Sequence, residues 1–328
     1  MLLDPYKRHL NYLRISLTDR CNLRCAYCMP EDGVSKLLHQ DILTYEELIK
    51  LAKLAVGLGI EKIRLTGGEP LVRKGIADFI RSLKEISGIR DISLTTNGVL
   101  LSDQAEELWQ AGIRRINISL DTLDREKYKE ITRFDCFDRV WEGIQKAEAL
   151  GFSPIKLNMV VMKGVNDDEI LSFGRLSMEK PYHLRFIEFM PVGPDNNWRS
   201  ERFLSSEETL KKLKTLGDLS LINGQGFDGP AKRMAFTGAK GEIGLISPLS
   251  EHFCPQCNRL RLTAEGRLRV CIFSENETDL RTPLRQGASD EELKNIIHLA
   301  VNQKPESHSL QSQPIPQRCQ RPMSKIGG

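Results

Sequence analysis

Six of the eight cysteines in the sequence stand in two groups of three, and their spacing points to metal chemistry. Cys21, Cys25 and Cys28 form the first group, a C-x3-C-x2-C pattern directly after an expected strand. Three thiolates so close together can surround one metal centre, but they cannot complete a four-ligand cage. An iron–sulfur cluster held by three cysteines keeps one iron open to a further ligand. The alternative is a structural zinc site completed by His39 or by a remote cysteine.

The second group has a C-x2-C-x13-C pattern and consists of Cys254, Cys257 and Cys271. A zinc ribbon would need further ligands, of which His252 could supply one, so the spacing leaves zinc and a cluster equally open. Four arginines lie within the same stretch: Arg259, Arg261, Arg267 and Arg269. A planar guanidinium suits phosphate, and on a strand Arg259 and Arg261 share a face. An open metal site beside paired arginines indicates a phosphorylated substrate, whereas the plainer alternative is a solvated basic face.

Polar residues also follow three expected strands, at the point where each strand ends. The motifs are TGGEP (66–70), TTNG (95–98) and SLD (119–121). Paired glycines let a ligand approach the backbone closely, and Glu69 offers an acceptor for an amine. Each motif alone is more typical of a tight turn or a helix cap. Because α/β folds place their sites at the carboxyl ends of strands, the three motifs and the first cysteine group predict one site.

The elements that must position these residues alternate along the first two thirds of the chain. Strand patterns cover residues 11–17, 60–66, 91–96, 114–120, 154–161 and 183–190. Amphipathic helices lie between them, and we expect helix starts at Thr44 and Ser102 and helix ends at Gly59, Gly112 and Gly151. Six successive βα units imply a parallel sheet, which could be doubly wound or an incomplete barrel.

The pattern changes after residue 216. Short β-type segments follow at 232–238, 241–247 and 259–270, and a helix is expected near 289–303. We therefore divide the chain into residues 1–220 and residues 221–328. The tail from Lys304 is rich in Gln, Ser and Pro, which is typical of disorder, although it ends in Gly327 and Gly328.

The composition of the 328 residues limits the classes of protein to which the chain can belong. Forty-seven Lys and Arg against 44 Asp and Glu leave a net charge of +3, which excludes a disordered charged chain and a polybasic coat for nucleic acid. No apolar stretch is long enough for a membrane span, and Asp4 and Pro5 lie where a signal peptide would be basic and then apolar. We expect a cytoplasmic protein with reduced thiols, which favours metal ligands over disulfides.

The first cysteine group resembles the signature of the radical S-adenosylmethionine (SAM) superfamily, because the aromatic Tyr27 precedes the last cysteine and GGEP follows. The resemblance implies a full or partial βα barrel with a [4Fe–4S] cluster on Cys21, Cys25 and Cys28. It also implies that the open iron binds the amine and carboxylate of SAM, which is then split reductively to give a 5′-deoxyadenosyl radical. The role of the protein would be to bind the cofactor and to tune its reactivity.

The segment CNRLRLT between clustered cysteines, together with the terminal Gly-Gly, is similar to the GTP 3′,8-cyclase family, which begins molybdenum cofactor biosynthesis. The resemblance runs from about Tyr12 to Gly328. It implies a second [4Fe–4S] cluster on Cys254, Cys257 and Cys271, whose open iron meets the guanine of GTP. It also implies that the flexible tail inserts into the barrel mouth and orders the site, which glycines would permit.

The resemblance also assigns individual residues to the two ligands. The expected SAM site comprises Tyr27, Gly68, Glu69, Asn97, Ser119 and Met190. The expected GTP contacts are Arg14, Arg64, Thr95, Lys156, Arg259, Leu260 and Arg261. Among these, Arg14, Arg259 and Arg261 are expected to take part in catalysis as well as in holding the triphosphate. Cys136 and Cys319 receive no role.

The prediction is therefore an α/β fold, an incomplete (β/α)6 TIM-like barrel with a C-terminal β-containing extension that covers the barrel mouth and carries the second cluster. The expected enzyme is a carbon–carbon bond-forming lyase that cyclises GTP to (8S)-3′,8-cyclo-7,8-dihydroguanosine 5′-triphosphate. Its partners would be an electron donor and a downstream cyclic pyranopterin monophosphate synthase. A homodimer is compatible with the sequence, and neither membrane nor nucleic acid is expected. The rival interpretations are a peptide-maturing radical SAM enzyme and a zinc-binding module that interacts with nucleic acid.

Overall fold

The computed structural model describes residues 1–193, 197–222, 229–308 and 319–327. Its strands are β1 (Tyr12–Ser16), β2 (Lys62–Thr66), β3 (Asp91–Thr96), β4 (Arg115–Ser119), β5 (Ile155–Val161), β6 (Tyr182–Glu188), β7 (Leu219–Leu221), β8 (Lys232–Phe236), β9 (Glu242–Ile246), β10 (Arg259–Leu262), β11 (Arg267–Arg269) and β12 (Thr278–Asp279). Its α-helices are α1 (Tyr45–Gly57), α2 (Ile76–Lys84), α3 (Leu101–Gln110), α4 (Arg125–Thr132), α5 (Phe137–Ala149), α6 (Ile170–Glu179), α7 (Ser206–Leu213), α8 (Arg281–Arg285), α9 (Asp290–Asn302) and α10 (Met323–Ile326).

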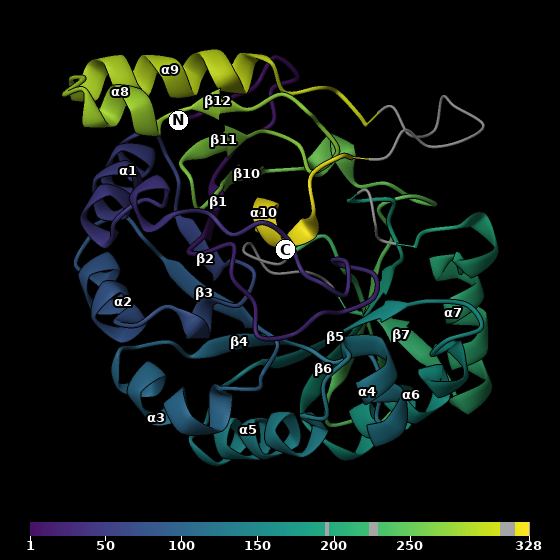
Figure 1. Ribbon diagram of the computed structural model, residues 1–328. Coiled ribbons are helices and arrows are strands. Elements are labelled where there is room, and N and C mark those ends of the chain that lie inside the picture. The colour runs from purple at the N-terminus through teal and green to yellow at the C-terminus, as the bar shows by residue number, and fades with distance from the viewer. Residues whose placement is uncertain (194–196, 223–228, 309–318, 328) are drawn as a thin grey trace.

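Strands β1 to β6 stand side by side in chain order and are all parallel, and at least one helix joins each strand to the next. Helices α1 to α9 lie outside a curved ring of strands, whereas α10 and the C-terminal end of the chain lie inside it (Figure 1). All six expected strands are present, so the incomplete TIM-like barrel is confirmed over the doubly wound sheet. Parallel strands joined in this way place their carboxyl ends at one mouth.

The C-terminal region extends the sheet at both of its ends, which the sequence did not indicate. Strand β10 pairs in parallel with β1, and β9 pairs in parallel with β6. Antiparallel strands then continue the sheet, β11 and β12 beyond β10 and β8 and β7 beyond β9. Within the described residues, β12 and β7 are the end strands of one 12-stranded sheet, so the barrel stays open. The division at residue 220 remains a prediction, and it falls within a shared sheet.

Local sequence signals set several of the helix boundaries. The Thr44 side chain accepts from the Glu47 N–H and the Glu47 carboxylate accepts from the Thr44 N–H, so α1 begins with the expected capping box. The expected start at Ser102 is wrong, because α3 already begins at Leu101. Leu101 is buried in the core and its N–H donates to the Gly98 carbonyl at 3.0 Å, which starts the first turn one residue earlier. The expected terminal glycines all have positive φ: Gly59, Gly112 and Gly151.

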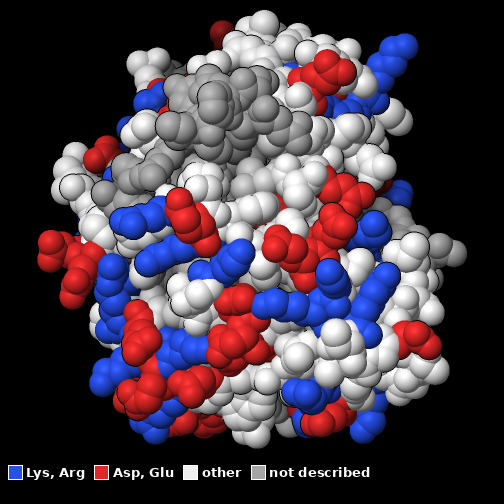
Figure 2. All heavy atoms as spheres, turned by 90° about the vertical axis from the view of Figure 1, so that its right-hand side faces the viewer, with Lys and Arg blue, Asp and Glu red and all other residues white. Residues whose placement is uncertain are grey.

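Charged side chains of both signs are interspersed on the face shown in Figure 2. Surface cations commonly pair with carboxylates, for example Lys127 with Asp168 at 2.8 Å and Lys212 with Asp167 at 2.6 Å. A mixed surface of this kind agrees with the small net charge of the chain. Among the described helices, none is both long enough and apolar enough to cross a membrane.

Candidate functional site

A cavity of about 310 Å³ lies inside the ring of strands. Its walls come from the barrel strands and the loops at their ends, from residues between His252 and Phe273, and from Met323 and Ser324 of the tail. This volume is in the range of small-molecule sites. Apart from Lys156 and Leu260, every residue predicted for the site lines this cavity: Arg14, Cys21, Cys25, Tyr27, Cys28, Arg64, Gly68, Glu69, Thr95, Asn97, Ser119, Met190, Cys254, Cys257, Arg259, Arg261 and Cys271.

The first cysteine group lies on a loop that follows β1 and packs against the end of α4. The N–H groups of Arg24 and Ala26 donate to the carbonyls of Thr132 at 3.1 Å and Ile131 at 2.8 Å. Arg133 adopts a left-handed φ of 63° after α4, and its guanidinium donates to the Arg24 carbonyl at 2.7 Å. The backbone around the three cysteines is therefore fixed by a helix that is distant in sequence.

The thiols of this loop are suited to hold a positively charged centre. Burial raises the pKa of Cys21 to about 11 and that of Cys28 to about 12, and it also raises the pKa of Cys25. A bound metal centre reverses this effect, because a ligating thiol is deprotonated. The Cys21 Sγ already accepts from the Leu23 N–H at 3.4 Å and from the Asn97 side-chain amide at 3.7 Å. Such donors favour the thiolate, so the loop fits a cluster of the kind that the spacing indicates.

Gly67 and Gly68 are required where the chain packs closely on itself. A Cβ at Gly67 would lie 2.7 Å from the Thr18 carbonyl oxygen, and one at Gly68 would lie 2.4 Å from the Arg20 carbonyl oxygen. The Gly68 N–H also donates to the Thr18 carbonyl at 2.7 Å. Besides the predicted approach of a ligand, the glycines therefore hold the cysteine loop against the end of β2.

Glu69, a lining residue of the cavity, links the end of β2 to the end of β3. Its carboxylate accepts from the Thr96 hydroxyl at 2.7 Å, from the Leu71 N–H at 3.0 Å and from the Asn97 N–H at 2.7 Å. Burial raises the pKa of Glu69 to about 7 in spite of these three donors. A carboxylate offers about four acceptor positions, and the hydrogen bonds among the described residues use three of them.

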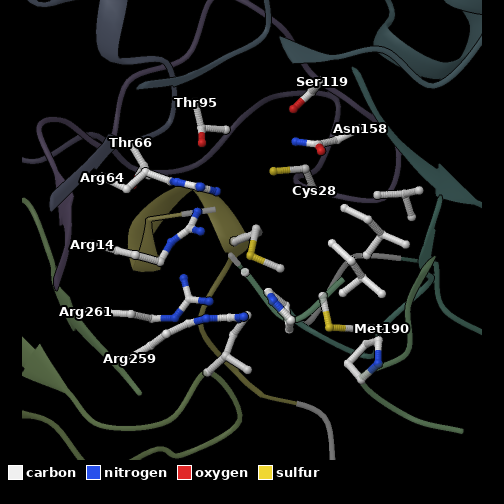
Figure 3. Close-up of a pocket in the computed structure, with 18 of the residues that line it drawn as sticks. Arg14, Cys28, Arg64, Thr66, Thr95, Ser119, Asn158, Met190, Arg259 and Arg261 are labelled. Carbon is white, nitrogen blue, oxygen red and sulfur yellow. The ribbon is translucent and has the colours of Figure 1, made fainter. Parts of the chain in front are cut away.

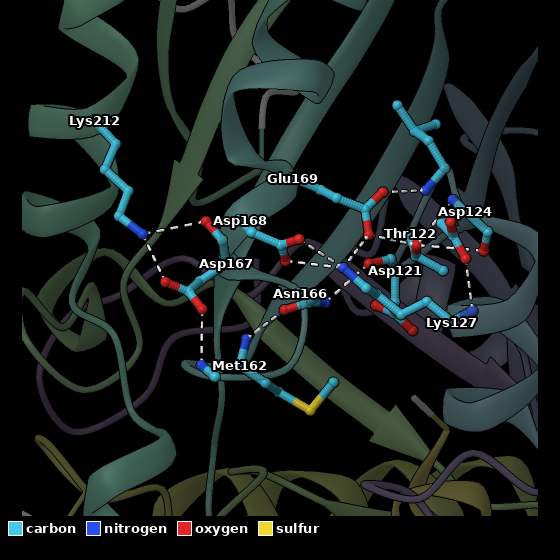
Figure 4. A network of polar contacts seen from close by, with 12 residues as sticks. Asp121, Thr122, Asp124, Lys127, Met162, Asn166, Asp167, Asp168, Glu169 and Lys212 are labelled. Carbon is cyan, nitrogen blue, oxygen red and sulfur yellow. Dashed lines mark hydrogen bonds and ion pairs between the residues drawn. The ribbon is translucent and has the colours of Figure 1, made fainter.

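Asp121, just after β4, ties the cysteine loop to two neighbouring strands. The Tyr27 hydroxyl donates to one carboxylate oxygen at 2.8 Å, and the Val160 N–H donates to the other at 2.8 Å. Figure 4 shows the network around Asn166, whose side-chain amide donates to the carbonyls of Asp121 at 2.8 Å and Val160 at 2.9 Å. These bonds fix the aromatic residue of the first cysteine motif, a contact that the SLD motif did not reveal.

The second cysteine group lies on a turn before β10 and at the end of the β10–β11 hairpin. The ammonium of buried Lys304 donates to the Cys257 Sγ at 3.6 Å, to the Arg259 carbonyl at 3.2 Å and to the Val270 carbonyl. Burial alone would raise the pKa of Cys257, yet Lys304 and Arg259 lower it overall. A thiolate stabilised by buried cations fits a ligand of an iron–sulfur centre. Among the described residues, no three His, Cys, Asp or Glu side chains are arranged to hold a single metal ion.

The expectation that the tail from Lys304 is disordered is wrong for residues 304–308 and 319–327. Lys304 and His308 are buried, and the His308 Nε2 lies 2.8 Å from the Pro248 carbonyl oxygen. Composition averages over a whole segment, so it cannot reveal a few residues with specific buried partners. Residues 309–318 and Gly328 lie outside the described residues.

The end of the tail lies among the arginines of the cavity, as the family resemblance implies. Gly327 follows α10 with a left-handed φ of 76°. Its carbonyl accepts from the Arg14 Nε at 3.3 Å and from the Arg261 Nη1 at 3.0 Å. A non-glycine residue would be strained in this conformation, so the glycine lets the tail turn within the barrel.

Arginines from three adjacent strands form one wall of the cavity. Arg14 of β1 stands in register with Arg64 of β2 and with Arg261 of β10, and Arg259 lies beside them (Figure 3). Burial lowers the pKa of Arg14 and lowers that of Arg261 to about 10, and the neighbouring arginines add to both effects. Cations crowded in this way favour a ligand with several negative charges.

Lys156 and Leu260 do not line the cavity. Lys156 lies one step deeper than the lining residue Asn158 on the same face of β5, where burial and then Arg185 lower its pKa to about 6. The side chain of Leu260 belongs to the hydrophobic core, because it alternates along β10 with Arg259 and Arg261.

The cavity residues that were not predicted from the sequence include Tyr12, Asn158 and Arg185. The strand periodicity could have identified two of them, because residues two apart on a strand face the same side. Tyr12 is two residues before Arg14, and Asn158 is two residues after Lys156. Arg185 is a strand arginine of the same kind as Arg14. Burial alone would raise the pKa of the Tyr12 phenol, but Arg64, Arg14 and Lys62 lower it to about 8.

Comparison with known proteins gives matches along most of the chain. Residues 15–176 match the radical SAM superfamily, and residues 182–310 match the family described as Molybdenum Cofactor Synthesis C. A GTP 3′,8-cyclase of Thermodesulfovibrio yellowstonii is 50% identical over 327 residues, covering 99% of each chain. A GTP 3′,8-cyclase of Desulforamulus reducens is 48% identical over 331 residues, covering 100% of each chain.

Among solved structures, Streptococcus suis SuiB bound to S-adenosylmethionine has a similar fold. The TM-score is 0.60, the match covers 95% of this chain and 76% of that chain, and the sequences are 14% identical. At so low an identity the likeness shows the fold alone, and it agrees with the partial barrel described above.

Proposed function

The chain belongs to the GTP 3′,8-cyclase family of the radical SAM superfamily, and we propose that its cavity is where GTP is cyclised. The product is (8S)-3′,8-cyclo-7,8-dihydroguanosine 5′-triphosphate, formed early in molybdenum cofactor biosynthesis. One observation carries the proposal: the superfamily's cysteine loop, a second cysteine group and a wall of arginines all face one cavity. A radical source and a polyanionic substrate could therefore meet there.

Membership of the superfamily brings with it SAM and a [4Fe–4S] cluster. When bound, these groups supply the 5′-deoxyadenosyl radical that removes the hydrogen from ribose carbon 3′ of GTP. Cys21, Cys25 and Cys28 would hold the cluster, and the carboxylate of Glu69 would accept a hydrogen bond from the amine of SAM. The other residues that we assign to SAM line the same part of the cavity wall: Tyr27, Gly68, Asn97, Ser119 and Met190.

A second [4Fe–4S] cluster on Cys254, Cys257 and Cys271 is part of the proposal. Its support is that all three thiols line the cavity and that Lys304 and Arg259 lower the pKa of Cys257. Cys254, Cys257 and Cys271 would hold such a cluster with one iron left open, which would offer a binding position for guanine. The residues assigned to this cluster thus place the base, while the first cysteine loop places SAM.

The triphosphate binds to the arginine wall. Arg14, Arg64 and Arg261 offer planar donors from three neighbouring strands, and Thr95 offers a buried hydroxyl that has no partner among the described residues. Bidentate guanidinium–phosphate pairs give both charge and orientation. We assign Arg14, Arg259 and Arg261 to catalysis as well, because they line the same cavity as both cysteine groups.

The proposed reaction also requires other proteins and both regions of this chain. The enzyme needs an electron donor, since SAM cleavage is reductive, and its product passes to a cyclic pyranopterin monophosphate synthase. Residues 1–220 supply the SAM site, whereas residues 221–328 supply the second cluster and the tail, in a cytoplasmic protein for which a homodimer is compatible with the sequence. Burial of the reacting atoms beneath the tail keeps water and loose side chains away from a reactive carbon centre.

An anaerobic turnover assay tests the proposed function. Protein reconstituted with iron and sulfide is mixed with reductant, SAM and one of GTP, ATP, CTP or UTP, and 5′-deoxyadenosine is measured. We expect about eight irons per chain and formation of 5′-deoxyadenosine that depends on GTP, with none in the matched Cys25→Ser variant. Stoichiometric zinc in protein isolated without oxygen, or no GTP dependence in fully reconstituted protein, would contradict the proposal.

A further inference from the structure

We propose that Arg321 and Cys319 anchor the tail, and that Glu277 couples this anchor to the loop that carries Cys271. The tail anchor is defined as Cys319 and Arg321 together with their partners Glu265, Arg269 and Glu277. These residues do not line the cavity, so they act as positioning residues for the tail that enters it.

The charged half of the tail anchor is a chain of ion pairs. The Arg321 guanidinium donates to the carboxylates of both Glu265 and Glu277. Glu277 also accepts from Arg269, whose side chain is fully buried at 0% exposure. Glu277 therefore forms ion pairs with two arginines, one in the tail and one at the end of β11. Ion pairs that are withdrawn from solvent in this way are costly to break from one side.

Arg269 carries the coupling from Glu277 to the second cysteine group. Its Nη2 donates to the carbonyls of Ile272 at 3.4 Å and of Ser274, which belong to the loop directly after Cys271. The same nitrogen lies 3.5 Å from the Cys319 Sγ. Loss of the charge on Glu277 would thus loosen both the tail and the loop, whereas loss of the charge on Glu265 would loosen the tail alone.

Cys319 joins the tail to the opposite side of the open sheet. It forms a parallel bridge with Val192, the Gly193 N–H donates to the Cys319 carbonyl at 2.8 Å, and the Cys319 N–H donates to the Pro191 carbonyl at 3.3 Å. Residues 191–193 follow β6, whereas Arg269 ends β11. In the strand order, β10 and β1 to β5 separate β11 from β6, so the tail anchor links two strands that are far apart in the sheet.

Apolar packing completes the tail anchor. Val192, Cys319 and Ile326 are buried together, and Ile272, Phe273, Met190 and Met323 pack against them. This cluster therefore contains residues from the segment after β6, from the loop after Cys271 and from the tail. Met190, which we assign to the SAM site, shares the cluster with the tail residues, so the tail contacts both proposed cofactor sites.

Hydrogen–deuterium exchange on the full-length protein tests the tail anchor without requiring turnover. In Arg321→Gln, we expect amides of residues 319–327 and the Gly193 amide to exchange about tenfold faster, equivalent to about 1.4 kcal/mol of local stability. Arg285→Gln is the matched control, because it removes another arginine that pairs with a glutamate, Glu47, away from the tail. Equal exchange in both variants would overturn the proposal.

Two glutamate variants test the coupling. Glu265→Gln should speed exchange in 319–327 only, whereas Glu277→Gln should speed it in 319–327 and in 271–277. If the two variants show the same exchange pattern, Glu277 does not couple the loop to the tail. Arg321→Lys should exchange more slowly than Arg321→Gln but faster than the wild type. Lysine keeps the positive charge, but it lacks the planar guanidinium that pairs with two carboxylates.

The expected effect of Arg321→Gln on GTP turnover rests on the proposed function. The expected effect on hydrogen exchange does not. With the wild-type protein active, Arg321→Gln should lower kcat for GTP turnover and leave the iron content unchanged. Altered exchange in a protein that never turns over GTP would refute the proposed function and keep the tail anchor. Unaltered exchange in an active enzyme would refute the tail anchor and keep the function.

Discussion

The pH dependence of GTP binding should show whether Lys156 responds to the triphosphate. Lys156 is buried on β5, one step deeper than the cavity-lining Asn158, and burial and then the neighbouring Arg185 lower its pKa to about 6. A polyanion in the cavity would offset the repulsion from the arginines and favour the charged ammonium. The pKa of Lys156 would then rise on binding, so GTP binding would take up a proton and become tighter as the pH falls.

The size of the effect follows from the free-state pKa. At pH 7 about a tenth of the Lys156 side chains are protonated, and at pH 8 about a hundredth. If binding restores the charge, each GTP takes up about 0.9 proton at pH 7. The Kd should then fall about tenfold from pH 8 to pH 7, which is about 1.4 kcal/mol. Below about pH 6 this gain ends, because Lys156 is already charged before GTP binds.

Calorimetric titration under anaerobic conditions, in two buffers with different heats of protonation, measures the proton uptake directly. Lys156→Met should lose the uptake and bind GTP more weakly, whereas Lys156→Arg should lose the uptake and keep the charge. Protonation of GTP itself and of Tyr12 is shared by all three proteins and cancels in the comparison. The reasoning is refuted if wild type and Lys156→Met show the same proton uptake and the same slope of Kd between pH 7 and pH 8.

Three further changes test other parts of the site. Cys257→Ser should lower bound iron by about half, because the first cluster keeps its three cysteine ligands. The same variant should form no cyclised product. An unchanged product yield would remove the second cluster from the mechanism. Deletion of Gly327 and Gly328 should reduce kcat about tenfold or more with little change in Tm, and a fully active truncated protein would make the tail a passive segment. Gly68→Ala should cost about 1–3 kcal/mol of unfolding free energy by denaturant titration, since its Cβ would lie 2.4 Å from the Arg20 carbonyl, and unchanged stability would contradict this close contact.

The barrel and its mouth could be predicted because they depend on local patterns. Six strands with apolar periodicity, each followed by an amphipathic helix, determine a parallel sheet, and the polar motifs at their ends then share one mouth. Arg14, Arg64 and Arg261 were predicted from strand positions and motif matches, and the structure brings them to one level of the sheet. Arg185 carried the same strand signal, and a consistent use of the two-residue period would have included it.

Contacts between distant segments could not be predicted in this way. Nothing near Lys304 in the sequence indicates that its ammonium contacts Cys257, and nothing near Tyr27 indicates the bond to Asp121. The pairing of β9 with β6 and of β10 with β1 also depends on which sheet edges remain available once the six units have folded. Composition was misleading for the tail, because Cys319 and Arg321 lie in a polar segment yet make specific contacts with buried partners.

The most direct test of the central claim, that one cavity brings the radical source to the ribose of GTP, follows a hydrogen atom. Reconstituted protein is given SAM and GTP that carries deuterium only at the 3′ carbon, and 5′-deoxyadenosine is analysed by mass spectrometry. The account predicts that one deuterium appears in 5′-deoxyadenosine, and that none appears when the label is on another ribose carbon. Unlabelled 5′-deoxyadenosine from the 3′-labelled GTP, formed in step with product, would contradict it.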